Sequence, residues 1–159
     1  MISRGDDSPT DIRDQLHRDH ESALAELEAL RAEGDAARCR ENLRRLRRAW
    51  MVHALAEETV VYRALEGVEG ASRADERFVE HELVEALFDK LTRTPPGSLE
   101  WRARLSVARE LIMRHIETEH EQLFAQLAER YDAAALAGLA GQFRSACEKL
   151  SMLEDAKAA

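Results

Sequence analysis

The sequence predicts an all-α protein: an up-down-up-down four-helix bundle with an additional C-terminal helix. Apolar residues recur at steps of three and four along most of the chain, which is the period of a helix buried on one face. Charged residues make up 34% of the 159 residues and aromatic residues 5%, a balance that favours helices. Glycine or proline marks each break between the first four periodic segments, so we expect one domain with short connections.

The predicted helices begin at residues that favour helix starts. Ser8 is the expected N-cap of the first helix, with Pro9 at its first helical position. Asp35 caps the second helix, and a capping-box pattern from Ser72 opens the third, whose core stripe includes Phe78. The five helices are expected at about residues 9–31, 36–66, 72–93, 99–130 and 132–153.

The chain is expected to divide into three parts. Residues 1–7 are polar and form a flexible N-terminus. Residues 8–131 form the bundle. Residues 132–159 form an Ala-rich C-terminal helix that either packs on the bundle or mediates a homodimer, and the pattern leaves both alternatives open. Two cysteines, Cys39 and Cys147, fall on apolar stripes and are predicted to be buried free thiols.

Polar residues replace apolar ones in the middle of four of these stripes. Each half of the chain carries a lone histidine followed, 33 or 34 residues later, by a His-x-x-x-Glu pair on one helix face. Counted from one end of an up-down bundle, these residues lie at similar depths, roughly 13–18 Å or one turn deeper. We therefore expect six side chains to meet: His20, His53, Glu57, His81, His115 and Glu119.

Imidazoles and carboxylates buried together favour a metal site. Burying these groups without a partner costs several kcal/mol for each ionised group, and a bound cation removes that cost. The donor set suits iron, manganese or zinc, and the lack of thiolates argues against a typical structural zinc site. The two glutamates could bridge two ions, each with two histidines, which leaves positions for an oxo or hydroxo bridge and a small ligand.

Other polar residues near these positions have less certain roles. Glu85 lies about 40° round the helix from His81. Three roles are open for it: a metal ligand, an acceptor for the second ring nitrogen of a histidine ligand, or a salt-bridge partner. We place His17 at the edge of its stripe, outside the ligand set or at the surface. We expect His120 to lie outside the ligand set, and Glu58 and Glu117 to be solvated.

Four motifs in these helices carry the candidate ligands. They are Asp19-His20, His53-Ala-Leu-Ala-Glu57-Glu58-Thr-Val-Val-Tyr62, Glu80-His81 and His115-Ile-Glu-Thr-Glu119-His-Glu-Gln-Leu-Phe124. Over about residues 10–130 the chain thereby resembles the hemerythrin HHE cation-binding family of bacterial hemerythrin-like proteins. The resemblance implies a four-helix bundle that holds two non-haem irons, with zinc or manganese as substitutes. Members of the family bind oxygen or act in iron sensing, nitric-oxide responses or iron–sulfur repair.

The chain departs from the family pattern at three points. Glu85 stands where oxygen-carrying hemerythrins have a second histidine in the third helix, so their five-histidine site is not reproduced. His120 replaces the second acid of the fourth-helix motif. Arg63 and Ala125 stand where a proline often follows the aromatic residue, which should affect only how the helices end.

Three functions fit this pattern. The first is a di-iron protein that binds or responds to O2, peroxide or NO as a sensor, scavenger or store. The second is a di-iron enzyme with peroxidase, NO-reducing or oxidase-like turnover, or a protein of iron sensing, storage or repair. The third is an interaction module in which metal only stabilises the fold. The sequence leaves open whether the protein is an enzyme.

Charge and hydropathy narrow the expected partners and location. The net charge of −8 argues against nucleic acid or an anionic membrane as the main partner. The chain has no apolar run long enough to span a bilayer and no apolar stretch typical of a signal peptide at its N-terminus. We therefore expect a cytoplasmic protein whose partner is a small diatomic molecule or peroxide.

Overall fold

The computed structural model describes residues 11–67 and 72–158, and in this part of the chain it contains helices and no strand. The all-α prediction is confirmed. The second and fourth helices of the bundle each change from α-helical to π-helical hydrogen bonding part of the way along. The elements are α1 (Ile12–Ala32), α2 (Ala36–Ala56), η1 (Glu57–Tyr62), α3 (Ser72–Thr92), α4 (Leu99–Thr118), η2 (Glu119–Leu123), α5 (Phe124–Arg130) and α6 (Ala133–Ala158).

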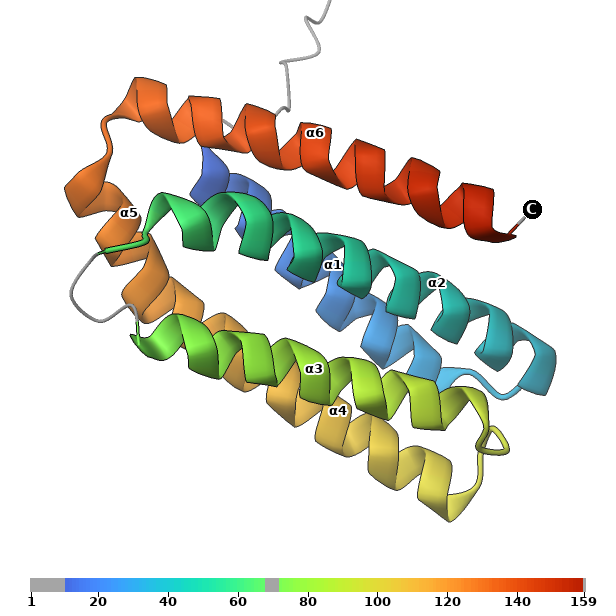
Figure 1. The fold of residues 1–159 in the computed structure, drawn as a ribbon. Helices are drawn as coiled ribbons and strands as arrows, with labels where there is room; N and C mark the ends of the chain where they lie inside the picture. The colour runs from blue at the N-terminus through green and yellow to red at the C-terminus, as the bar shows by residue number, and fades with distance from the viewer. Residues whose placement is uncertain (1–10, 68–71, 159) are drawn as a thin grey trace, which may run out of the picture.

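The helices α1 to α4 form a closed ring, as Figure 1 shows. Each helix packs against the next one along the chain, and α4 returns to pack against α1. Such a ring follows from short connections, which force consecutive helices to run antiparallel. The C-terminal helix α6 lies over α1 and α2 and also contacts η1. The structure is thus a helical bundle with an additional helix.

Side-chain caps mark where the helices begin. Asp35 accepts a hydrogen bond from the backbone nitrogen of Arg38 at 2.9 Å, which confirms its predicted role at the start of α2. Ser98 caps α4 in the same way, 3.1 Å from the backbone nitrogen of Trp101. Gly97, just before it, has a φ of +78°, a conformation that glycine adopts without strain.

The first helix begins later than the sequence predicts. Ser8, Pro9 and residues 1–7 lie outside the described residues. Asp11 is extended, and its side chain accepts a hydrogen bond from the backbone nitrogen of Arg13 at 2.7 Å, so Asp11 is the N-cap of α1. The sequence analysis chose Ser8, but Asp11 is an equally good N-cap type, and residue type alone does not separate the two.

Two apolar clusters fill the bundle. The first cluster lies toward the α1–α2 and α3–α4 connections and includes Leu27, Leu43, Phe88 and Leu105. The second cluster lies toward the opposite end, under α6. It includes Leu16, Val61, Leu123, Leu136 and Phe143.

Three core predictions can be compared with the observed burial. Phe78 was predicted to lie in the core of the third helix, but it is 37% exposed, and its ring packs edge to face against Tyr62 with 5.5 Å between centroids. Cys39 and Cys147 are both free thiols, and Cys39 is buried whereas Cys147 is only half-buried. In the described part of the chain, every helix is too short or too polar to cross a membrane.

Candidate metal centre

The six side chains predicted as ligands lie in a buried layer between the two apolar clusters. None of the six is more than 7% exposed. Along the first, second and fourth helices of the bundle they fall between residues of the two clusters, as His20 does between Leu16 and Leu27. The layer draws one histidine from each of the four bundle helices and one glutamate from each π-helical segment: His20, His53, His81, His115, Glu57 and Glu119.

The four histidines form two pairs that turn their Nε2 atoms inward. His20 Nε2 lies 3.2 Å from His53 Nε2, and these residues come from the neighbouring helices α1 and α2. His81 Nε2 lies 3.3 Å from His115 Nε2, and these come from α3 and α4. Each half of the chain therefore supplies one pair.

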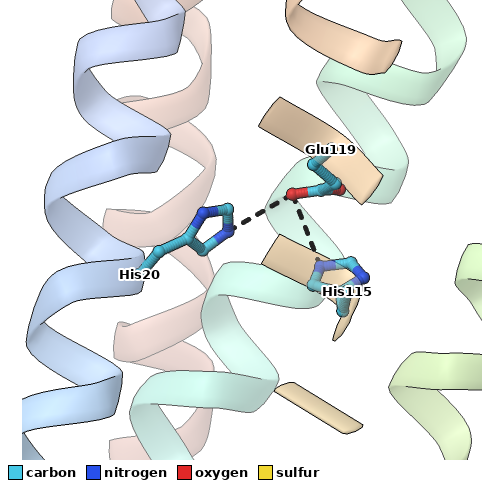
Figure 2. Close-up of side chains that lie close together, drawn as sticks. All are labelled: His20, His115 and Glu119. Atoms are coloured by element: carbon cyan, nitrogen blue, oxygen red, sulfur yellow. Dashed lines mark ion pairs between the residues drawn. The ribbon is translucent and has the colours of Figure 1, made fainter. Parts of the chain in front are cut away.

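Each glutamate contacts histidines of both pairs. The Oε2 atom of Glu57 lies 3.8 Å from His53 Nε2, 3.5 Å from His81 Nε2 and 3.7 Å from His115 Nε2. The Oε2 atom of Glu119 lies 3.3 Å from His20 Nε2 and 3.4 Å from His115 Nε2, as Figure 2 shows. The carboxylates thus lie between the two histidine pairs.

Both glutamates stand at the first residue of a π-helical segment, which the sequence did not predict. A π-turn places residues five apart on one face, and such turns are frequent at functional sites. Tyr62 follows Glu57 by five residues, and its buried hydroxyl lies 3.2 Å from Glu57 Oε2 and 2.9 Å from Glu119 Oε1. Burial and the two nearby carboxylates hold the pKa of Tyr62 well above its usual value, so the hydroxyl remains a donor.

Tyr62 is a site residue that sequence reasoning missed. The signal was its place at the end of the second-helix motif, where it was noted only as an aromatic residue. Its counterpart in the second half of the chain, five residues after Glu119, is Phe124, which has no hydroxyl to offer. A single tyrosine therefore serves both carboxylates.

Two acids that precede lone histidines contact the histidine of the next helix. Asp19 Oδ2 lies 3.2 Å from His53 Nδ1, and Glu80 Oε2 lies 3.3 Å from His115 Nδ1. When Nε2 faces a ligand site, the proton sits on Nδ1, and a carboxylate there fixes the tautomer and the ring orientation. The sequence signal was the repeated acid–histidine pair, whose role we did not infer.

The prediction for Glu58 was wrong. It was expected to be solvated, but its side chain is only 19% exposed and Oε1 lies 2.7 Å from His81 Nδ1. Glu58 follows Glu57 on the helix and turns toward α3, the next helix of the ring. The position of a neighbouring helix is not visible in the period of one helix, so the pattern could not reveal this contact.

The remaining candidates lie outside this layer. Glu85 forms a salt bridge with Arg47, with Oε1 2.8 Å from Nε, which matches the third of its predicted alternatives. The His17 side chain is 51% exposed and lies 3.4 Å from Glu21. The ring of His120 lies 5.1 Å from that of His17, centroid to centroid. Glu117 is exposed, as predicted.

The pKa values of the ionisable groups in the layer depend strongly on one another. Burial alone would raise the pKa of Glu57, but contacts with His115 and His81 outweigh it and hold that pKa well below its usual value. Burial and the charge of Glu57 raise the pKa of Glu119 to about 7. Burial would lower the pKa of His115, but Glu119, Glu57 and Glu80 raise it to about 10. In the metal-free layer, histidine protons therefore balance the carboxylate charge, and a bound cation would take the place of these protons.

The residues fit a bound cation by two criteria. First, Glu57 Oε1 and Glu119 Oε2 are buried and accept no hydrogen bond from any described residue, and Glu119 Oε2 instead lies within ion-pair distance of His20 and His115. Second, three groups of ligand atoms lie within 4.8 Å of one another: His20, His115 and Glu119; His20, His53 and Glu57; and Glu57, His81 and His115. Imidazole nitrogens with carboxylate oxygens suit iron, manganese or zinc.

The fold and this layer together define a helical bundle of the cation-binding class. The family model described as the hemerythrin HHE cation binding domain matches residues 9–154, and the chain belongs to this family. The chain is also 22% identical over 150 residues to a protein of Nostoc sp. described as a DNA nickase. This match covers 94% of the chain but only 43% of that relative. A search of solved structures found no match.

Proposed function

We propose that the protein holds two non-haem iron ions and binds or responds to O2, peroxide or NO. The observation that carries this proposal is the placement of both glutamates, each in contact with histidines of both pairs. A carboxylate in that position can bridge two cations. His20 and His53 would then hold one ion, and His81 and His115 the other.

The chain's own residues would prepare this centre in three ways. Tyr62 orients both carboxylates through its hydroxyl. Carboxylates behind three of the four histidines orient the rings. The apolar clusters cover the layer toward both ends of the bundle. Iron bound there supplies a redox-active Lewis acid with coordination positions that protein ligands do not fill.

The salt bridge between Glu85 and Arg47 favours a binding or sensing role over a di-iron enzyme. Binding of metal by Glu85 would have made the site richer in carboxylates, which suits a di-iron enzyme, but the Glu85 side chain is engaged by Arg47. The interaction-module alternative is tested by removing the metal with a chelator. If metal only stabilises the fold, the bundle should unfold, whereas a functional centre should lose its absorption bands and keep its helices.

The first test is metal content by elemental analysis, combined with absorption spectra of the anaerobically reduced protein before and after addition of O2, peroxide or NO. We expect two irons per chain and a spectral change with at least one of the three. Protein that carries zinc or no metal, and gives no spectral response after iron loading, would refute the proposal. His17→Ala is a matched control, because His17 lies outside the layer and its loss should change neither result.

A further inference from the structure

The two halves of the chain repeat the contacts between acidic residues and the Nδ1 atoms of the layer's histidines, except at one position. In the first half, Glu58 follows Glu57 and contacts Nδ1 of His81 in the other half. In the second half, His120 follows Glu119, and the repeat assigns it the corresponding contact with His20. The His20 and His120 rings do lie next to each other, 5.7 Å between centroids. A histidine thus stands where the repeat would place a carboxylate.

This substitution leaves His20 without an acceptor. His20 Nδ1 is buried and has no hydrogen bond to any residue that the structure describes, and the same holds for His120 Nε2. Nδ1 of each of the other three histidines faces a carboxylate: Asp19 for His53, Glu58 for His81 and Glu80 for His115.

A cavity reaches the same half of the layer. It has a volume of about 420 Å³ and lies between α1, α2 and α6. His20 and His53 line it, together with Trp50 and Cys147, whereas His81 and His115 do not. The cavity offers a route for cation exchange on the side where His20 is least supported.

We propose that His120 makes the centre unequal, so that the cation at His20 and His53 is bound more weakly and exchanges faster than the one at His81 and His115. A carboxylate behind a histidine ligand fixes the ring and raises its basicity, and losing such a partner typically costs about 10–100-fold in metal affinity. His120 acts here as a positioning residue through His20. The inference depends on the proposed two-ion centre.

The test is stepwise titration of the metal-free full-length protein with Co²⁺, followed by calorimetry and visible absorption. We expect two binding steps of unequal affinity in the unchanged protein. His120→Glu should tighten the weaker step by roughly 10–100-fold and leave the tighter one alone. Glu58→His, the matched change in the other half, should weaken the tighter step by a similar factor. His20→Ala should abolish the weaker step.

Each alternative outcome has a distinct meaning. Two steps of equal affinity, or an affinity ratio that His120→Glu does not change, would overturn this inference and leave the two-ion centre intact. A single bound Co²⁺ would overturn both proposals. Circular dichroism checks that each variant is folded. If His120→Glu fails to fold, His120→Gln, whose amide oxygen can also accept from His20, should tighten the weaker step by a smaller factor.

Discussion

The buried layer of histidines and glutamates differs from the two apolar clusters beside it in what stabilises it. Leu43, Phe88 and Leu105 of the first cluster are at most 1% exposed, and their burial is favourable by itself at about 25 cal/mol per Å². The layer instead buries groups whose desolvation is unfavourable unless they are paired. The clusters therefore stabilise the fold by themselves, whereas the layer is stable only when its charged groups are paired with one another or with a cation.

Replacing Glu57, the proposed bridging ligand, should have the largest effect on the metal content of the layer. Glu57 contacts histidines of both pairs, so Glu57→Ala should lower the metal content below two ions per chain. Elemental analysis of the purified variant measures this content. Unchanged stoichiometry would show that Glu57 does not bridge. The helix content should be preserved, because the apolar clusters remain complete.

A truncation in the first apolar cluster should instead lower the stability of the fold and leave the metal content unchanged. Leu105 is fully buried, so Leu105→Ala should lower the free energy of unfolding by about 2–5 kcal/mol. Denaturant unfolding measures this change. The metal content at saturation should stay the same, because Leu105 contacts the cluster and not the layer. A loss of bound metal would mean that metal binding by the layer depends on packing in the first cluster.

Removing the Tyr62 hydroxyl should lower the stability by an intermediate amount. Tyr62→Phe keeps the ring but removes the donor that faces both glutamates, and leaving buried acceptors unpaired costs about 1–3 kcal/mol. Unfolding of the metal-free protein should show this loss of stability at neutral pH. The control is a double variant that adds Phe124→Tyr, at the matching position of the other half. This added hydroxyl should not restore the stability lost with the Tyr62 hydroxyl.

The smallest effect is expected from His120→Ala. His120 lies outside the six predicted ligands, so the variant should bind as many metal ions at saturation as the unchanged protein. Elemental analysis after metal loading gives the number. Loss of an ion would instead make His120 a ligand.

The helices and the six residues of the layer could be predicted from the local pattern of the sequence. Helical period is a local property, so a histidine or glutamate in an apolar stripe could be assigned to the interior from neighbours three and four residues away. The depth of each residue followed from the rise per residue and short connections.

The side chains that surround that layer could be identified only from the packing of the helices against one another. The contact of Glu58 with His81, the salt bridge of Glu85 with Arg47 and the place of the Tyr62 hydroxyl all depend on how neighbouring helices are rotated. The π-turns at the two glutamates have the same origin, since nothing in the local period calls for them. Contacts between helices depend on packing across the bundle, which no single helix encodes.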